Sequence, residues 1–310
     1  MKKKKFRKLS ITSAITQVAL GLLTVRKDGK SRCAGSAMLI LPNLALTAKH
    51  VIKNGLAIFE PGIEFSGAMN TETMIVTMQF FKGGGGNFYH IRRVWFNESD
   101  DDDFAIIELW PDPRQTGVPN WHWSPTFLSF EPPSKFATVF GVGYSNEIGE
   151  VHTRPAESID GIRPHLNLYW KDGLMISEGK VTKVLPNGSG KPLLRYPCFK
   201  VGMQVDDGMS GGPVFDGGIC CGIITHGATT FKDSQSHTTT CSTLEPLLNL
   251  QINAPVLDVF DGTHYFYVRE LFERNILREY RRIPQSEGRI YVPVEDPEEH
   301  AGSASGEPRV

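Results

Sequence analysis

Short apolar runs recur along the chain, and in many of them apolar and polar residues alternate. Glycine, proline, asparagine or aspartate separates most of these runs, so each run indicates a strand that ends in a turn. Such a series of short strands is typical of a β-barrel or β-sandwich protein. The predicted strands cover residues 14–26, 34–41, 44–48, 73–81, 104–109, 136–142, 175–184, 199–205, 213–216 and 218–225.

Two segments near the C-terminus have helical periodicity instead. Apolar residues fall on one face of residues 267–282, which predicts a helix that packs against the barrel rather than one that binds a partner. Residues 243–252 predict a shorter helix, with Ser242 or Thr243 as its N-cap. The chain is polar from Pro284, and we expect residues 284–310 to form a flexible tail. The apolar face of the longer helix consists of Val268, Leu271, Phe272, Ile276, Leu277 and Tyr280.

The N-terminus begins with a basic cluster, MKKKKFRK, which resembles the start of a signal peptide. The apolar run at residues 18–25 ends in Arg26 and Lys27 without a small-residue cleavage site. We therefore expect residues 1–13 to form a basic flexible tail, with weak binding to a membrane or nucleic acid as the alternative. No apolar stretch reaches the length of about 18 residues that a membrane-spanning helix needs, so no membrane span is predicted.

The composition is that of an ordinary globular protein of 310 residues, 40% of them hydrophobic and 22% charged. The 33 basic and 34 acidic residues nearly cancel, which removes a global electrostatic reason to bind nucleic acid. The five cysteines show no CxxC or CxxH spacing, so we predict neither structural zinc nor a disulfide framework. Free thiols favour a reducing compartment, and we expect a cytoplasmic protein that needs no metal or cofactor.

The segment 208–214 contains the first candidate for catalysis, Ser210. A serine hydroxyl needs a base to become a nucleophile, and the amides of Gly208 and Ser210 can face a developing oxyanion. By itself the segment also fits a glycine-rich turn with a solvent-facing serine. It matches the G-x-S-x-G elbow of α/β-hydrolases as well, but Pro213 and the β-type Val214 follow where that elbow needs a helix.

A candidate base and a candidate acid precede the serine. His50 ends an apolar run, and Asp103 stands where an acidic loop enters another apolar run. A carboxylate at that place can hold the second imidazole N–H and stabilise the imidazolium. Asp102 is the alternative acid, because a slip of one residue in the strand turns the other side chain inward. The order His, Asp, Ser also differs from α/β-hydrolases, in which both partners follow the serine.

These segments resemble those of the trypsin-like serine peptidases, which have the chymotrypsin fold. Residues 46–50 are similar to the LTAAH motif of that family, and residues 103–105 match its D-x-A motif. Residues 208–213 match G-[DN]-S-G-G-P except at Met209. The chain looks most like the compact, disulfide-free bacterial members.

The resemblance implies an all-β fold of two packed, six-stranded antiparallel β-barrels of the chymotrypsin type. It places the N-terminal barrel at residues 14–118 and the C-terminal barrel at residues 119–255. A helical extension at residues 256–283 and the flexible tail then follow.

The resemblance also implies a role for each site residue. Ser210 is the nucleophile, His50 is the general base and then the general acid, and Asp103 orients the imidazole. The amides of Gly208 and Ser210 form the oxyanion hole. The substrate lies as an extended strand against Thr225, His226 and Gly227, and Gln204 falls at the floor of the specificity pocket. Metal ligands are not implied.

Four departures from the family pattern carry information. Met209 replaces the acid that pairs with a newly cut N-terminus in zymogen-activated members, so we expect a cleft that does not depend on such cleavage. Cys33 lacks a disulfide partner, because Val51 stands where the family has its second cysteine. Gln204 replaces a carboxylate at the pocket floor, and His226 stands where the family has an aromatic residue.

These residues leave the specificity open. Gln204, Thr225 and His226 favour a polar or acidic P1 side chain, unless they are polar groups with a purely structural role.

The sequence as a whole predicts a serine endopeptidase that cleaves protein or peptide substrates through an acyl-enzyme. The alternative is a catalytically silent peptide-binding or scaffold protein, a pseudoprotease. A regulatory protein partner is compatible with either function.

Overall fold

The computed structural model describes the parts of the chain that carry the fold, and they include every predicted site residue. They are residues 18–26, 31–56, 60–62, 73–80, 86–99, 101–111, 127–144, 174–188, 195–227, 238–285 and 288–293. The predicted basic tail at 1–13, the start of the first predicted strand and the chain after residue 293 lie outside them.

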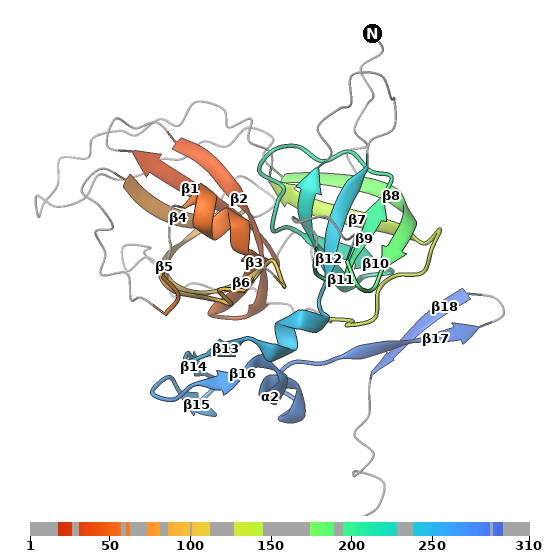
Figure 1. The fold of residues 1–310 in the computed structure, drawn as a ribbon. Coiled ribbons are helices and arrows are strands. Elements are labelled where there is room, and N and C mark those ends of the chain that lie inside the picture. Colours follow the sequence, from red (N-terminus) through yellow and green to blue (C-terminus); the bar gives the residue numbers. More distant parts are fainter. Residues whose placement is uncertain are drawn as a thin grey trace, which may run out of the picture.

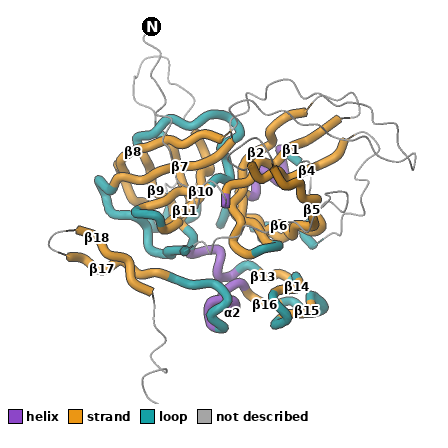
Figure 2. The backbone as a smooth tube through the Cα atoms, turned by 180° about the vertical axis from the view of Figure 1, so that it is seen from behind, coloured by secondary structure: helices purple, strands orange, loops and turns teal. Residues whose placement is uncertain are grey.

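The fold is mostly β, as predicted, and its strands form two groups of six that lie side by side (Figures 1 and 2). The first group has the order β1-β2-β3-β6-β5-β4 and closes on itself, because β4 also pairs with β1. All its pairings are antiparallel. Its strands are β1 (Ala19–Arg26), β2 (Ser31–Leu41), β3 (Leu44–Ala48), β4 (Thr73–Phe80), β5 (Gly86–Phe96) and β6 (Phe104–Pro111).

The second group has the order β10-β11-β12-β9-β8-β7, and β7 pairs with β10 to close it. These pairings are antiparallel as well. Its strands are β7 (Thr138–Tyr144), β8 (Leu174–Leu185), β9 (Cys198–Val201), β10 (Pro213–Asp216), β11 (Ile219–Gly227) and β12 (Thr239–Thr243).

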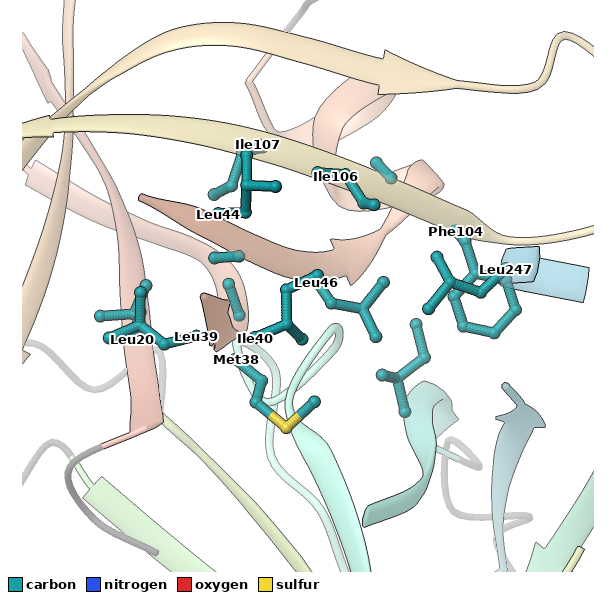
Figure 3. Close-up of a cluster of buried hydrophobic side chains, with 14 of the residues drawn as sticks. Leu20, Met38, Leu39, Ile40, Leu44, Leu46, Phe104, Ile106, Ile107 and Leu247 are labelled. Atoms are coloured by element: carbon teal, nitrogen blue, oxygen red, sulfur yellow. The ribbon is translucent and has the colours of Figure 1, made fainter. Parts of the chain in front are cut away.

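Branched and aliphatic side chains fill the first barrel, which explains why the apolar runs of the sequence predict its strands so well. All five residues of β3 are buried, and β6 is buried from Phe104 to Leu109. Figure 3 shows Met38, Leu46 and Ile106 inside this cluster, together with Leu247 from the C-terminal part of the chain. One continuous core therefore joins the first barrel to the C-terminal segment.

The pattern of apolar residues misses two strands of the barrels. β5 contains His90, Arg92 and Arg93 and so lacks an apolar run, although it pairs with β4 and β6. β12 is short and rich in hydroxyl residues, and part of it was predicted to begin a helix. Its threonines are nevertheless buried, because the Thr239 and Thr243 hydroxyls donate to the carbonyls of Met203 and Pro197.

The segment after β12 forms a small unit below the first barrel in Figure 1. It begins with the 3-10 helix η2 (Glu245–Asn249) and contains the α-helix α2 (Val268–Glu273). Four two-residue strands pair within it: β13 (Gln251–Ile252) with β16 (Phe266–Tyr267), and β14 (Pro255–Val256) with β15 (Phe260–Asp261). A hairpin of β17 (Tyr280–Gln285) and β18 (Gly288–Pro293) follows.

Three predictions about this C-terminal part are wrong. The helix predicted over 267–282 ends at Glu273, because Asn275 adopts a left-handed conformation with φ of 55° and the N–H groups of Ile276 and Leu277 both turn back to the Leu271 carbonyl. Ser242 and Thr243 do not cap η2, since both lie in β12 and Leu244 occupies the cap position. The tail predicted from residue 284 begins inside the β17–β18 hairpin.

Candidate active site

His50 and Asp103 are brought together by the pairing of β3 with β6. Ala48 is opposite Phe104 in this antiparallel register, so the chain just after β3 lies next to the residue just before β6. The Asp103 Oδ2 atom is 2.8 Å from His50 Nδ1, and Oδ1 accepts the His50 backbone N–H at 3.0 Å. The Asp103 side chain is 9% exposed and that of His50 is 28% exposed. A carboxylate on Nδ1 favours the tautomer in which Nε2 can accept a proton.

Asp102 points away from this pair, although it is the neighbouring acid. Its Oδ2 accepts from Asn97 Nδ2 at 2.6 Å, and its Oδ1 lies 3.6 Å from Lys49 Nζ. Lys49 Nζ also donates to the carbonyls of Asn97 and Ser99. Lys49 thus holds the loop that leads into Asp103, a role that sequence reasoning missed.

The loop 206–212 that carries Ser210 is bound on both sides by neighbouring strands. The Gly211 N–H donates to the Ile224 carbonyl at 2.7 Å, and the Ile224 N–H donates to Gly212 at 2.8 Å. Gly211 has φ of 84°, and a Cβ atom there would overlap Ser36 O and Thr47 Oγ1. The glycine is therefore required both by its backbone angle and by the close approach of β2 and β3.

Two partly exposed amides of this loop lack the hydrogen bonds that hold most of the others. The N–H groups of Met209, Gly211 and Gly212 donate to backbone carbonyls of Asp206, Ile224 and Met209, respectively. Within the described residues, the N–H groups of Gly208 and Ser210 have no hydrogen-bond partner. Gly208 and Ser210 are partly exposed, so two unpaired amides on either side of Met209 can reach a bound group and suit a site that binds an anion.

Ser210 lies near the segment that carries His50. Gly35 of β2 separates them: a Cβ atom on Gly35 would be 2.9 Å from the Ser210 carbonyl oxygen and also against the side chain of Val51, the residue after His50. On the other side of the loop, the space at Gly211 is bounded by Thr47 and Ala48 at the end of β3. The tertiary structure therefore places Ser210 beside the segment that carries His50, and the contacts of the described residues include no hydrogen bond between the Ser210 and His50 side chains.

The residues predicted to bind substrate differ in their exposure and in their contacts. Thr225 is fully buried and its hydroxyl donates to the Thr240 carbonyl at 3.0 Å, so its side chain has a structural partner. His226 is exposed, and its ring centroid is 5.5 Å from that of His50, with 40° between the ring planes. Gly227 ends β11 opposite Thr239, and Gln204 is partly exposed.

Burial shifts the pKa of two residues near the His50–Asp103 pair, His226 and Tyr196. The pKa of His226 is lowered, first because part of the ring is desolvated although the residue as a whole is exposed, and then by the neighbouring His50, while Asp103 acts in the opposite direction. The pKa of Tyr196 is raised above its usual range, first by burial and then by the charge of Asp103. The neighbouring hydroxyls of Thr225 and Ser242 oppose that shift. Sequence reasoning missed Tyr196, because no motif contains it.

Met209, the position that departs from the family motif, is buried in the second barrel. Its sulfur accepts the Asp206 N–H at 3.5 Å, and its side chain packs in the core cluster that also contains Val139 and Ile224. The position that is acidic in zymogen-activated peptidases is apolar and enclosed here.

The described residues also bear on the predictions about metals, membranes and disulfides. No group of three or more potential metal ligands occurs among them. None of the helices in the same regions is long and apolar enough to cross a membrane. All five cysteines are free and buried.

The sequence matches the model of the trypsin-like peptidase domain over residues 35–219, which is more than half of the chain. The chain therefore belongs to the family of trypsin-like peptidase domains. No curated protein gives a significant match.

Two solved structures are similar to the chain. The active form of the Rv3671c protease from M. tuberculosis has 16% sequence identity and a TM-score of 0.44 over 74% of this chain and 77% of that chain. The inactive form of the Rv3671c protease has 15% identity and a TM-score of 0.41, over 74% of this chain and 85% of that one. The family assignment rests on the sequence match and not on these structural scores.

Proposed function

We propose that this trypsin-like peptidase is a serine endopeptidase that uses Ser210, His50 and Asp103 as a catalytic triad. The observation that carries the proposal is the His50–Asp103 hydrogen bond at 2.8 Å, in the same contact region as a serine whose loop has two unpaired amides. A histidine held by a buried carboxylate and a serine beside unpaired N–H groups are the groups that acyl transfer needs.

The reaction follows from these groups. His50 Nε2 accepts the Ser210 hydroxyl proton while Ser210 Oγ attacks the carbonyl carbon of the scissile peptide. The negative charge that forms on the carbonyl oxygen is stabilised by the N–H groups of Gly208 and Ser210. The imidazolium then gives its proton to the leaving amine, and water repeats the sequence on the acyl-enzyme with His50 again as base.

The substrate is a protein or peptide that lies in a cleft between the two packed barrels. Its backbone pairs with the end of β11 near Gly227, and its side chains reach His226 and Gln204. Because Thr225 is buried and bonded to Thr240, we assign side-chain recognition to the other two residues. A preference for polar or acidic P1 residues is consistent with their chemistry.

Two finer features belong to the same proposal. The apolar, enclosed Met209 supports a cleft that does not require a newly cut N-terminus for activity. Five buried thiols outside any disulfide support a reducing, cytoplasmic location. A regulatory protein partner is compatible with this function.

Labelling with a fluorophosphonate, followed by intact-mass measurement, tests the proposal directly. Wild type is expected to gain one adduct as fluoride leaves and Ser210 Oγ is phosphonylated, whereas Ser210→Ala and His50→Ala gain none. A folded wild type without an adduct would instead favour the pseudoprotease function, and a search for a peptide ligand would follow.

Turnover of a peptide substrate tests the roles of the two acids. Asp103→Asn is expected to lower kcat by about 10⁴-fold, because the amide favours the wrong imidazole tautomer. Asp102→Asn is the matched control and is expected to change kcat little, since Asp102 contacts Lys49 and Asn97 and not His50. Equal loss in both variants would contradict the assignment of Asp103 as the orienting acid.

A further inference from the structure

Ser36 of β2 forms hydrogen bonds through all of its polar groups, and two of these bonds join the first barrel to the loop 206–212 that carries Ser210. It is fully buried. Its N–H donates to the Ser210 carbonyl at 2.7 Å, and its hydroxyl donates to the Gly208 carbonyl at 2.8 Å. The same hydroxyl oxygen accepts the N–H of Tyr144 in β7 at 2.8 Å, and the Ser36 carbonyl accepts from Thr47 Oγ1 at 2.7 Å.

Of the two carbonyls that Ser36 binds, that of Gly208 lies between the two oxyanion amides along the chain and that of Ser210 follows them. The Gly208 carbonyl belongs to the peptide between Gly208 and Met209, which is the only peptide plane between the Gly208 N–H and the peptide that carries the Ser210 N–H. A peptide unit is planar, so fixing its carbonyl also fixes the direction of the bonds that leave it. Gly208 has φ of 99°, where glycine rotates at little cost, so hydrogen bonds must hold this peptide. Its N–H donates to the Asp206 carbonyl at 3.1 Å, and the Ser36 hydroxyl holds its carbonyl from the other side.

The space around the hydroxyl leaves little freedom for another arrangement. A Cβ atom on Gly143 would lie 2.9 Å from Ser36 Oγ and 2.9 Å from the Met209 Cα atom. The hydroxyl of Ser36 and the backbone of Met209 therefore both pack against Gly143 of β7. Two segments of the second barrel are held against one side chain of the first.

We propose that Ser36 is a positioning residue whose hydroxyl fixes the Gly208–Met209 peptide, and thereby the direction of the Gly208 and Ser210 amides. This inference rests on the proposed function, in which those amides stabilise the oxyanion. It also makes the geometry of the oxyanion hole depend on contact between the two barrels, because the donor is on β2 and the loop is in the second barrel.

Ser36→Ala tests the proposal by removing only the hydroxyl, since the backbone bonds to Ser210 and Thr47 can remain. We expect kcat to fall by about 10- to 100-fold with KM within about twofold, a smaller loss than the 10²–10³-fold that follows removal of an oxyanion donor itself. Affinity for a peptide boronate is expected to fall in parallel with kcat, and affinity for the matching non-electrophilic peptide is expected to stay unchanged.

Ser129→Ala is the matched control. Ser129 is also buried and its hydroxyl also donates to a backbone carbonyl, that of Glu131, outside the loop of Ser210. It is expected to lower Tm about as much as Ser36→Ala while leaving kcat and boronate affinity unchanged. Equal kinetics in both variants would mean that Ser36 has only a structural role, and would overturn the proposal.

Hydrogen exchange of the loop separates this inference from the proposed function, because it requires no activity. The hydrogen-bonded amides of Met209, Gly211 and Gly212 are expected to exchange at least about tenfold faster in Ser36→Ala than in wild type or Ser129→Ala. Unchanged exchange would overturn the inference whether or not wild type reacts with a fluorophosphonate. Faster exchange in a protein that no fluorophosphonate labels would support the positioning role and count against the peptidase.

Gly143→Ala provides a second route to the same hydroxyl. The added methyl group is expected to displace Ser36 Oγ and Met209 together, and so to lower kcat and boronate affinity as Ser36→Ala does. A Gly143→Ala enzyme with wild-type kcat and loop exchange would contradict the proposed dependence on this contact.

Discussion

At the scale of single residues, Lys49 makes a buried contact that is distinct from the catalytic groups. Its ammonium group satisfies two loop carbonyls and one carboxylate, and its side chain is 9% exposed. Its own backbone N–H donates to the Asp103 carbonyl at 3.1 Å. The side chain of Lys49 therefore stabilises the loop that ends in Asp103, while its backbone N–H holds Asp103 itself.

Lys49→Met is expected to lower the free energy of unfolding by about 3 kcal/mol, because the Asp102 charge and the two carbonyls lose a buried partner. Chemical denaturation measures the change. Lys53→Met is the control, because Lys53 pairs with the exposed Glu98 at 2.8 Å and a surface pair contributes about 0.5 kcal/mol. A loss at Lys49 no larger than that at Lys53 would rule out the stabilising role.

His226 makes stability depend on pH. Its pKa is lowered in the folded protein from the ordinary value of 6.5, so the unfolded chain binds the proton more readily. The stability that the neutral ring contributes is therefore complete above that ordinary pKa and is lost as pH falls toward the folded value. His226→Phe removes this dependence, and we expect the Tm of wild type to fall relative to that of the variant between about pH 8 and about pH 5. A constant difference in Tm across that range would contradict the pKa shift.

At the scale of elements, the loop 206–212 that carries Ser210 depends on β2 and β3, the two strands that enclose Gly211. A substitution there meets Ser36 O and Thr47 Oγ1 in addition to the cost of a positive φ. Gly218, in the turn between β10 and β11, has φ of 93° but no atom within 4 Å of an added Cβ. Comparing substitutions at Gly211 and Gly218 therefore distinguishes the cost of backbone strain from the cost of a clash with neighbouring strands.

Gly211→Ala is expected to lower the free energy of unfolding by more than about 3 kcal/mol and to abolish labelling by a fluorophosphonate. Gly218→Ala is expected to cost about 1 kcal/mol, the cost of the left-handed backbone alone, and to leave labelling unchanged. Denaturation and intact-mass measurement check both. Similar stabilities for the two variants would show that the strands around Gly211 can move apart at little cost.

At the scale of the whole molecule, the unit after β12 is part of the core. Leu247, Ile252 and Val268 are fully buried in the same cluster as the first barrel. Trp95 Nε1 of β5 donates to Asn253 Oδ1 at 2.8 Å, and Asn43 Nδ2 donates to the Pro255 carbonyl at 2.8 Å. The unit therefore closes one side of the first barrel.

A chain that ends at Thr243 is expected to be insoluble, because it exposes the apolar surface that this unit covers. A chain that ends at Tyr280 is the control: it keeps the buried residues up to Leu277 and loses residues 281–310, which include nearly all of the β17–β18 hairpin. We expect the control to remain folded with nearly the Tm of the full chain. Cooperative folding of the chain that ends at Thr243 would contradict the role of the unit in the core.

The sequence predictions were accurate for elements with a clear pattern of apolar residues and failed where contacts between distant segments determine the structure. Apolar strands such as β3 and β6 were predicted because burial on every side requires a continuous apolar run. β12 was missed because its buried threonines are satisfied by carbonyls of distant segments. The helix over 267–282 was predicted too long because its apolar spacing continues past Asn275, although the chain turns there into a strand.

The sequence by itself determined the mostly β fold, the family and the identity of the candidate catalytic residues, because these depend on local pattern and on motifs. Only the tertiary structure decided which acid contacts His50, which loop amides lack a partner, and that Thr225 is buried while His226 is exposed. Ser36, Lys49 and Tyr196 also emerged only there. Their roles consist of contacts between segments far apart in the chain, and the register of paired strands fixes such contacts without leaving a local pattern.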